Sequence, residues 1–238
     1  MINFYEKLRN KYYCIMERKI KALIFDMDGV LIDSYSMHKE ALEITAKEYG
    51  ITVSEEDFIS IFGKTSYEGI KSLPQFSFWS DEKIYEFNDK QDGRFREIFK
   101  TNPRYIEGSK LFLKKIYEKG YLIGIGTSAP KANAEVFLSV FGNNGFFRCV
   151  ITGDDVLKGK PDPEIYLKCA EALNQKPENC VVFEDSIMGI KSAKSAGATV
   201  IALTTTHKAD ELKEADYIIK NFVDPNLNLI FKELKIEI

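Results

Sequence analysis

Short apolar runs recur along this chain, and segments with helical periodicity separate them. The runs lie at residues 22–25, 121–126, 149–152, 180–183, 199–203 and 217–219. Runs that are apolar on nearly every residue are typical of strands buried on both faces of a parallel sheet. Helical patterns lie at residues 109–119, 163–173, 187–196 and 225–234. This alternation predicts an α/β fold with a doubly wound, Rossmann-like parallel sheet.

A block from residue 36 to about residue 103 has a helical pattern and no strand signal. Ser54, with Asp57 three residues later, is predicted to cap one helix. Ser80 is predicted to cap a long amphipathic helix that runs through Phe99. The first helix of the block should end at Gly50, and its apolar face should comprise Met37, Ala41, Leu42, Ile44 and Tyr49.

These patterns predict three parts of the chain. Residues 36–103 form an all-helical cap domain, which is inserted into a core domain made of residues 20–35 and 104–238. Residues 1–19 are interpreted as an N-terminal extension without a catalytic part. They contain no long apolar stretch of the secretory-signal type. A start at Met16 would leave a normal lead-in to the first strand.

The first apolar run, residues 22–25, is followed directly by Asp26 and Asp28. Their i, i+2 spacing puts both carboxylates on one side of an extended chain, and Gly29 then permits a turn. Ligands of doubly wound sheets bind beyond the carboxyl ends of the strands. Paired carboxylates repel there unless a cation such as Mg²⁺ joins them. The alternatives are an acidic surface turn or half of a calcium loop, but loop position 12 is Met37 and not Glu.

Polar residues also follow the second predicted strand. Thr127 and Ser128 offer a hydroxyl and free backbone N–H groups that can bind a phosphate, although capping of the next helix explains them equally well. Gly124, Gly126 and Ala129 match the spacing of a dinucleotide-binding fingerprint. The two glycines fall inside the strand and not in the turn after it, which disfavours that function.

Two later motifs carry charge. Lys160 lies in a loop just before a helix, where it could bind a phosphate or a charged nucleophile, or could be an ordinary exposed lysine. Glu184 and Asp185 follow a buried strand directly and suit a hydrated Mg²⁺. Asp185 or Ser186 could also cap the helix that follows, and the two roles are compatible.

Composition excludes several classes of function. The net charge is −3, so the chain lacks the basic excess that binding to nucleic acid or to an anionic membrane surface requires. No apolar run approaches the roughly 18 residues that a membrane span needs. The four cysteines form no C-x-x-C pair, which argues against a zinc site or a disulfide framework. We therefore expect a cytoplasmic protein without nucleic-acid or membrane partners.

Four motifs occur in the order found in the haloacid dehalogenase (HAD) superfamily: Asp26-x-Asp28-Gly29, Thr127, Lys160 and Glu184-Asp185. The residues around them, at 25–34, 159–163 and 183–190, resemble the β-phosphoglucomutase-like and phosphatase branch. The resemblance covers residues 20–222 and includes a helical cap between the first two motifs. It implies phosphoryl transfer on a Rossmann-like core.

The resemblance implies a role for each matching residue. Asp26 resembles the nucleophile that forms an aspartyl-phosphate. Asp28 resembles the general acid that protonates the leaving oxygen and then activates water. Thr127 and the Ser128 amide would bind phosphoryl oxygens, and Lys160 would hold Asp26 and offset the charge of the transferring group.

Mg²⁺ is the cofactor that the resemblance implies. Asp26, the backbone carbonyl of Asp28, and Asp185 would hold the ion, with Glu184 in a direct or indirect role. Dehalogenase members of the superfamily use no metal, but the pairing of Asp28 with Glu184 and Asp185 favours phosphoryl transfer.

His38 and the cap segment bear on the branch. By its distance from Asp28, His38 matches a histidine in the hinge of β-phosphoglucomutases, and a surface helix histidine is the alternative. In the cap, the mutase pattern has a Lys before a Gly, here Gly63, and an Arg three residues after it that grips a second phosphate. Here those two positions are Phe62 and Ser66.

Lysines near that segment are the candidates to replace the missing arginine. Lys64 or Lys71 could contact a second phosphate, but lysine lacks the bidentate fork of arginine. Gly63 and Lys64 are therefore, with His38, the candidates for substrate-binding or hinge residues.

We predict a monomeric, Mg²⁺-dependent phosphatase that hydrolyses a small phosphorylated metabolite, most simply a sugar phosphate. The alternative is a β-phosphoglucomutase-type hexose phosphate mutase, which returns the phosphoryl group to a second hydroxyl. A catalytically idle binding or regulatory protein is a third hypothesis, and the presence of both Asp26 and Asp28 argues against it. A dinucleotide-dependent oxidoreductase is the hypothesis that the sequence supports least.

Overall fold

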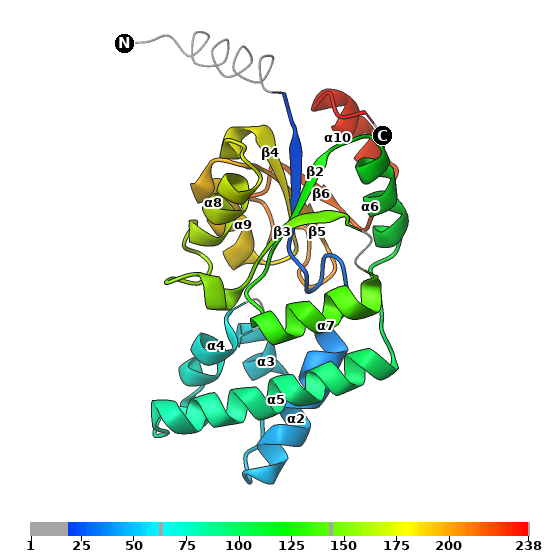
Figure 1. Cartoon of the computed structure of the whole chain (residues 1–238). Helices are drawn as coiled ribbons and strands as arrows, with labels where there is room; N and C mark the ends of the chain where they lie inside the picture. The colour runs from blue at the N-terminus through cyan, green and yellow to red at the C-terminus, as the bar shows by residue number, and fades with distance from the viewer. Residues whose placement is uncertain (1–18, 62–63, 143–144, 238) are drawn as a thin grey trace, which may run out of the picture.

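The structure, a computed structural model, describes residues 19–61, 64–142 and 145–237. Its centre is a six-stranded sheet in the order β3-β2-β1-β4-β5-β6, with every pairing parallel (Figure 1). The strands are β1 (Ala22–Phe25), β2 (Leu122–Gly126), β3 (Phe147–Ile151), β4 (Cys180–Glu184), β5 (Thr199–Leu203) and β6 (Tyr217–Ile219). The predicted doubly wound α/β fold is confirmed. The predicted N-terminal extension lies outside the described residues up to residue 18, as do Phe62 and Gly63.

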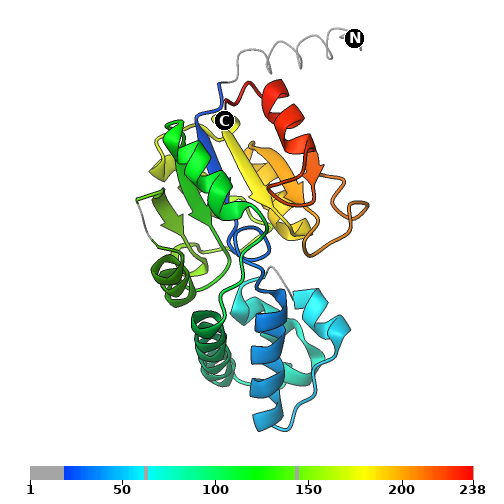
Figure 2. The same cartoon turned by 90° about the vertical axis from the view of Figure 1, so that its right-hand side faces the viewer.

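Separate helical layers cover the two faces of the sheet (Figures 1 and 2). One layer comprises α6 (Ser109–Glu118), α7 (Lys131–Phe141) and α10 (Asn226–Glu233), and the other comprises α8 (Glu164–Ala172) and α9 (Ile187–Ala196). Alternate residues of β1 pack against the two layers. Leu23 and Phe25 pack with the layer of α6, α7 and α10, and Ala22 and Ile24 pack with the layer of α8 and α9. Each large apolar side chain buried in this way contributes about 1.5–3 kcal/mol. Short 3₁₀ turns lie at Gly153–Asp155 and Pro177–Asn179.

The turn after β1 requires a glycine. Gly29 has φ +72°, and a Cβ atom there would lie 1.9 Å from Oδ2 of Asp185. Any other residue would clash with that carboxylate, because the turn brings the β1 loop against the end of β4. Thr205 Oγ1 fixes the same turn by donating to the Gly29 carbonyl over 2.6 Å. The backbone conformation of this turn therefore lets the carboxyl end of β1 lie directly against the carboxyl end of β4.

Between β1 and α6, the regular elements of the described residues are helices, and they lie below the sheet in Figure 1. They are α2 (Tyr35–Glu48), α3 (Glu55–Ile61), α4 (Ser66–Ser72), a 3₁₀ turn (Pro74–Phe76) and α5 (Asp81–Thr101), and we call this segment the cap. The predicted capping box forms, since Ser54 Oγ accepts from Asp57 N and Asp57 Oδ2 accepts from Ser54 N. Ser80 accepts from Lys83 N at the start of α5, as predicted.

One predicted core position in α2 is wrong. Ile44 is 43% exposed, whereas Thr45 and Ala46 are buried. The apolar stripe of α2 turns toward Leu42 and Ala46 because these residues face the cap cluster around Phe76 and Phe87. Thr45 can occupy a buried position because its hydroxyl donates to the Ala41 carbonyl over 2.7 Å.

The long helix α5 joins two apolar clusters. Its first half, with Ile84 and Phe87, packs inside the cap. Its second half, with Phe95 and Phe99, packs with the core cluster that contains β1. Buried polar residues lie between the two halves. The division into separate domains at residues 36 and 103 stays a prediction.

Candidate active site

Lys160 joins two carboxylates from different strands. Its Nζ donates to Asp26 Oδ1 over 2.8 Å and to Glu184 Oε1 over 2.6 Å. The side chain is only 2% exposed, so the alternative of an exposed loop lysine is wrong. Burial alone would lower the pKa of Lys160, but the charges of Asp26 and Glu184 outweigh it and raise the pKa above its ordinary value. Lys160 therefore stays charged.

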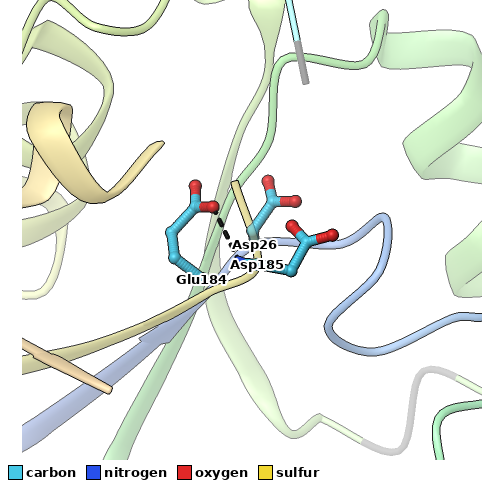
Figure 3. Close-up of side chains that lie close together, drawn as sticks. All are labelled: Asp26, Glu184 and Asp185. Carbon is cyan, nitrogen blue, oxygen red and sulfur yellow. Dashed lines mark hydrogen bonds between the residues drawn. The ribbon is translucent and has the colours of Figure 1, made fainter. Parts of the chain in front are cut away.

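Asp26, Glu184 and Asp185 form a buried group in which one oxygen of each lies within 4.8 Å of the others (Figure 3). The ammonium group of Lys160 pairs with two of these three carboxylates, Asp26 and Glu184. Burial raises the pKa of Asp185 well above its usual range, and repulsion from Glu184 and Asp26 adds to the shift. Clustered hard oxygen donors with too little positive charge fit a divalent cation such as Mg²⁺.

Glu184 is held through both of its oxygens. Oε1 accepts from Lys160 and from the Tyr166 hydroxyl, each over 2.6 Å. Oε2 accepts from the backbone N–H groups of Asp185 and Ser186 over 3.0 and 3.1 Å. A Cβ at Gly189 would lie 1.7 Å from Glu184 Oε1, so a glycine is needed at that position. Lys160 outweighs burial and lowers the pKa of Glu184.

Asp28 points to a different partner. Its Oδ1 lies 3.0 Å from His38 Nε2, and the imidazole stacks on Phe95 with ring centroids 3.7 Å apart. The His38 side chain is only 14% exposed, so the alternative of a surface histidine is wrong. Burial would raise the pKa of Asp28, but the charge and hydrogen bond of His38 outweigh it, and the pKa falls below its ordinary value.

Thr127 and Ser128 face the same pocket as Asp26. The Thr127 N–H donates to the Ile151 carbonyl over 3.0 Å, and its hydroxyl accepts from Ala129 N over 3.1 Å. Neither residue caps α7, whose N-cap is Pro130 without a side-chain cap, so the capping alternative is wrong. Within the described residues, the buried Ser128 hydroxyl has no hydrogen-bond partner. By contrast, Ser186 does cap α9 through Gly189 N.

The cap forms the opposite wall of this pocket with Phe58, Ile61, Lys64, Ser66, Gln91 and Asp92. Lys64 reaches the pocket, but its Nζ donates to Ser72 Oγ over 3.3 Å. Lys71 is paired with Asp81 on the cap surface. Gly63, the third candidate of the cap segment, lies outside the described residues.

Several polar residues of the site were missed by sequence reasoning. Asp92 of α5 accepts hydrogen bonds from Ser66 Oγ and from Asn133 Nδ2 of α7, each over 3.1 Å. Arg96 Nη1 donates to Asn133 Oδ1 over 3.0 Å, so Asn133 joins the cap to the core. Burial raises the pKa of Asp92. The available signal was polar residues at i, i+4 spacing on a helix that otherwise buries phenylalanines.

None of the described helices has the length and apolar character that crossing a membrane requires.

Comparison with known proteins identifies relatives across most of the chain. Residues 23–203 match the family model described as haloacid dehalogenase-like hydrolase. A phosphorylated carbohydrates phosphatase of Thermotoga maritima is 36% identical, over 75% of this chain and 82% of that protein. A validoxylamine A 7′-phosphate phosphatase of Streptomyces hygroscopicus subsp. limoneus is 30% identical, over 86% of this chain and 95% of that protein.

A solved structure of β-phosphoglucomutase from Clostridium difficile superposes with a TM-score of 0.80 at 23% identity, covering 91% of this chain and 97% of that one. This likeness concerns the fold alone. The comparisons confirm the predicted superfamily, the Rossmann-like sheet with a helical cap, and the predicted class of enzyme, a haloacid dehalogenase-like hydrolase.

Proposed function

The chain belongs to the haloacid dehalogenase-like hydrolase family, and on this premise we propose that it is a Mg²⁺-dependent phosphatase of a small phosphorylated sugar. The observation that carries the proposal is the buried group of Asp26, Glu184 and Asp185 with Lys160 between two of them. The names of the two phosphatase relatives support a phosphorylated carbohydrate as the substrate.

Asp26 is the proposed nucleophile. Lys160 holds its Oδ1, so the carboxylate is fixed in one orientation at the carboxyl end of β1, and its other oxygen can attack phosphorus. The bond between phosphorus and the leaving oxygen breaks as the aspartyl-phosphate forms. Thr127 and the Ser128 N–H border the same pocket and would bind the phosphoryl oxygens.

Asp28 is the proposed acid and base. It would give a proton to the leaving oxygen and then take one from the water that attacks the aspartyl-phosphate, which releases inorganic phosphate and restores Asp26. His38, 3.0 Å from Asp28 Oδ1, would fix the orientation of that carboxylate and favour the charged form that takes the proton from water in the second step.

Asp26, Asp185 and the Asp28 backbone carbonyl would hold Mg²⁺. When bound, the ion supplies positive charge against the phosphoryl oxygens. Both oxygens of Glu184 already accept hydrogen bonds. We therefore assign Glu184 to positioning Lys160, and not to direct metal binding.

The cap, residues 36–103, is the proposed lid over this pocket, with hinges near residues 34–36 and 102–107. Closing of the lid would exclude water other than the attacking molecule.

The cap wall favours a phosphatase over a mutase. Ser66 stands where the mutase pattern has an arginine, and its hydroxyl donates to Asp92. Lys64 Nζ donates a hydrogen bond to Ser72 Oγ. A distal phosphate would lack a bidentate contact at these two positions, and such charge-assisted contacts are worth about 1.5–3 kcal/mol.

One assay tests the proposal. The purified protein is incubated with β-glucose 1-phosphate and a trace of the 1,6-bisphosphate, with and without Mg²⁺, and inorganic phosphate and glucose 6-phosphate are both measured. We expect Mg²⁺-dependent release of inorganic phosphate with little interconversion. Faster accumulation of glucose 6-phosphate would establish the mutase, and absence of any Mg²⁺-dependent release across a panel of sugar phosphates would refute the phosphatase.

A further inference from the structure

A second hollow adjoins the pocket of Asp26, between the cap and the core. It has a volume of about 520 Å³, whereas the inner pocket has about 80 Å³. The two share part of their lining: Thr65, Ser66, Asp92, Ser128 and Pro130. Ligand sites commonly have volumes of roughly 300–1,000 Å³. The inner pocket has room for a phosphoryl group and its nearest atoms, and the larger part of a substrate would extend into the outer hollow.

We propose that the outer hollow is a distal substrate subsite for a polyhydroxylated ring that carries a protonated amine. This inference rests on the proposed phosphatase function and names its substrate class: a phosphorylated amino sugar or amino-cyclitol, with the phosphate at Asp26 and the amine at the cap.

Asn88 is the first observation that points to a ligand. Its side chain lines the outer hollow and is only 6% exposed. Neither its Oδ1 nor its Nδ2 has a hydrogen-bond partner among the residues that the structure describes. Leaving both atoms of a buried amide unpaired is unfavourable. A ring hydroxyl both donates and accepts, so it satisfies such an amide.

Ser128 supplies a second unpaired polar group, on the wall of the hollow that the core forms. Its buried hydroxyl, also without a partner in the described part of the chain, borders both the inner pocket and the outer hollow. Unpaired polar atoms therefore lie on two walls of the hollow, on α5 of the cap and on the loop after β2.

Charge determines which kind of group fits. Besides Asp92, whose pKa burial raises, three acids line the outer hollow, Glu68, Asp89 and Asp154, against one cation, Arg96. One guanidinium nitrogen of Arg96 is bound to Asn133. Carboxylates outnumber the cation, so the field in the hollow is negative and disfavours a second phosphate. A protonated amine gains attraction in the same place.

The test compares three substrates with the same ring and the same 6-phosphate: glucosamine 6-phosphate, glucose 6-phosphate and glucose 1,6-bisphosphate. We expect kcat/KM to fall in that order. The amine should be preferred over the hydroxyl by about three- to tenfold at low salt, and the preference should shrink as NaCl is added. Equal values for the amine and the hydroxyl, or a preference for the bisphosphate, would overturn the subsite.

Two variants locate the effect. Asp89→Asn should lower the amine-to-hydroxyl ratio, while Glu97→Gln, an exposed acid on the same helix outside the hollow, should leave it unchanged. Asn88→Leu should raise KM for both sugar phosphates relative to p-nitrophenyl phosphate, which has no ring hydroxyls to bind. An unaltered amine-to-hydroxyl ratio in Asp89→Asn would contradict the proposal.

Calorimetric titration separates this inference from the proposed reaction. The Asp26→Asn variant is titrated with the same three compounds in the presence of Mg²⁺. The same order of affinity would support the subsite even if the wild-type protein hydrolysed none of them, and that lack of hydrolysis would refute the phosphatase alone. Tightest binding of the bisphosphate, or equal binding of all three, would refute the subsite.

Discussion

The ammonium group of Lys160 donates a hydrogen bond to Asp26 across 134 positions of sequence. The contact is buried, and Glu184 is the second acceptor of the same ammonium. Burial raises the pKa of Asp26 to about 7, and the positive charge of Lys160 opposes the rise. The proposed nucleophile therefore depends on positive charge around it to stay ionised at neutral pH.

Asp26→Asn should lower activity by at least about 10⁴-fold, because an amide is a poor nucleophile and Asp26 is proposed to act as part of a catalytic unit. The fold should survive, since an amide oxygen can still accept from Lys160. Phosphate release and circular dichroism measure the two effects. Asp33→Asn, an exposed acid nearby, is the matched control. Retained turnover in protein shown by mass spectrometry to be free of wild type would refute covalent catalysis.

Mg²⁺ should stabilise the protein more at pH 8 than at pH 5.5. The raised pKa of Asp185 means that the metal-free native state binds a proton that the unfolded state releases. Without metal, stability is therefore lost as the pH rises through the folded pKa, and Mg²⁺ replaces that proton.

Thermal unfolding of chelator-treated protein, with and without Mg²⁺, measures this effect. At 100 times the dissociation constant the gain should be about 2.7 kcal/mol. Asp185→Asn should abolish the response. The same increase in melting temperature in that variant, or no increase in the wild type at pH 8, would contradict the assigned site.

His38→Asn should move the acidic limb of the pH–rate profile to higher pH. The pKa of Asp28 is low because the charge and hydrogen bond of His38 outweigh burial, so removing the charge raises that pKa. The carboxylate proposed to activate water then forms only at higher pH, and kcat at pH 6 should fall by up to about tenfold.

His207→Asn is the control, because His207, the second histidine of the chain, pairs with Glu211 outside the pocket. A profile of His38→Asn that coincides with the control would show that His38 does not set the charge of Asp28.

Asp92→Asn should increase stability near neutral pH. Burial raises the pKa of Asp92, so its contribution to stability is lost as the pH rises through the folded pKa. An amide keeps hydrogen-bonding groups for Ser66 and Asn133 without a buried charge, and a gain of about 1 kcal/mol is expected at pH 8. Urea unfolding at pH 4 and pH 8 measures it, and the difference from wild type should be larger at pH 8. A lower free energy of unfolding in the variant at both pH values would show that the ionised carboxylate of Asp92 is well paired.

The strands were predictable because burial on both faces leaves a continuous apolar run. β1, β5 and β6 match the predicted residues 22–25, 199–203 and 217–219. β3 begins at Phe147, two residues before the predicted start, because pairing with Ile123 of β2 extends it. Such an extension depends on the neighbouring strand and leaves no mark in the local pattern.

The acids of the site were predictable because each one ends a strand, so topology alone brings them to one edge. Tyr166 was not predictable. It sits in α8 among core residues, and only the packing of α8 against the sheet brings its hydroxyl to Glu184. Asp92 and Asn133 lie 41 positions apart and meet only where the cap contacts the core.

The apolar cluster of the cap around Phe76 and Phe87 is separate from the two clusters on the faces of the sheet. Distant substitutions usually act independently. Changes at Asn88 or Asp89 therefore need not disturb Asp26, Lys160 or Glu184. A lineage can in this way exchange one substrate for another through the cap while the reaction chemistry is inherited unaltered.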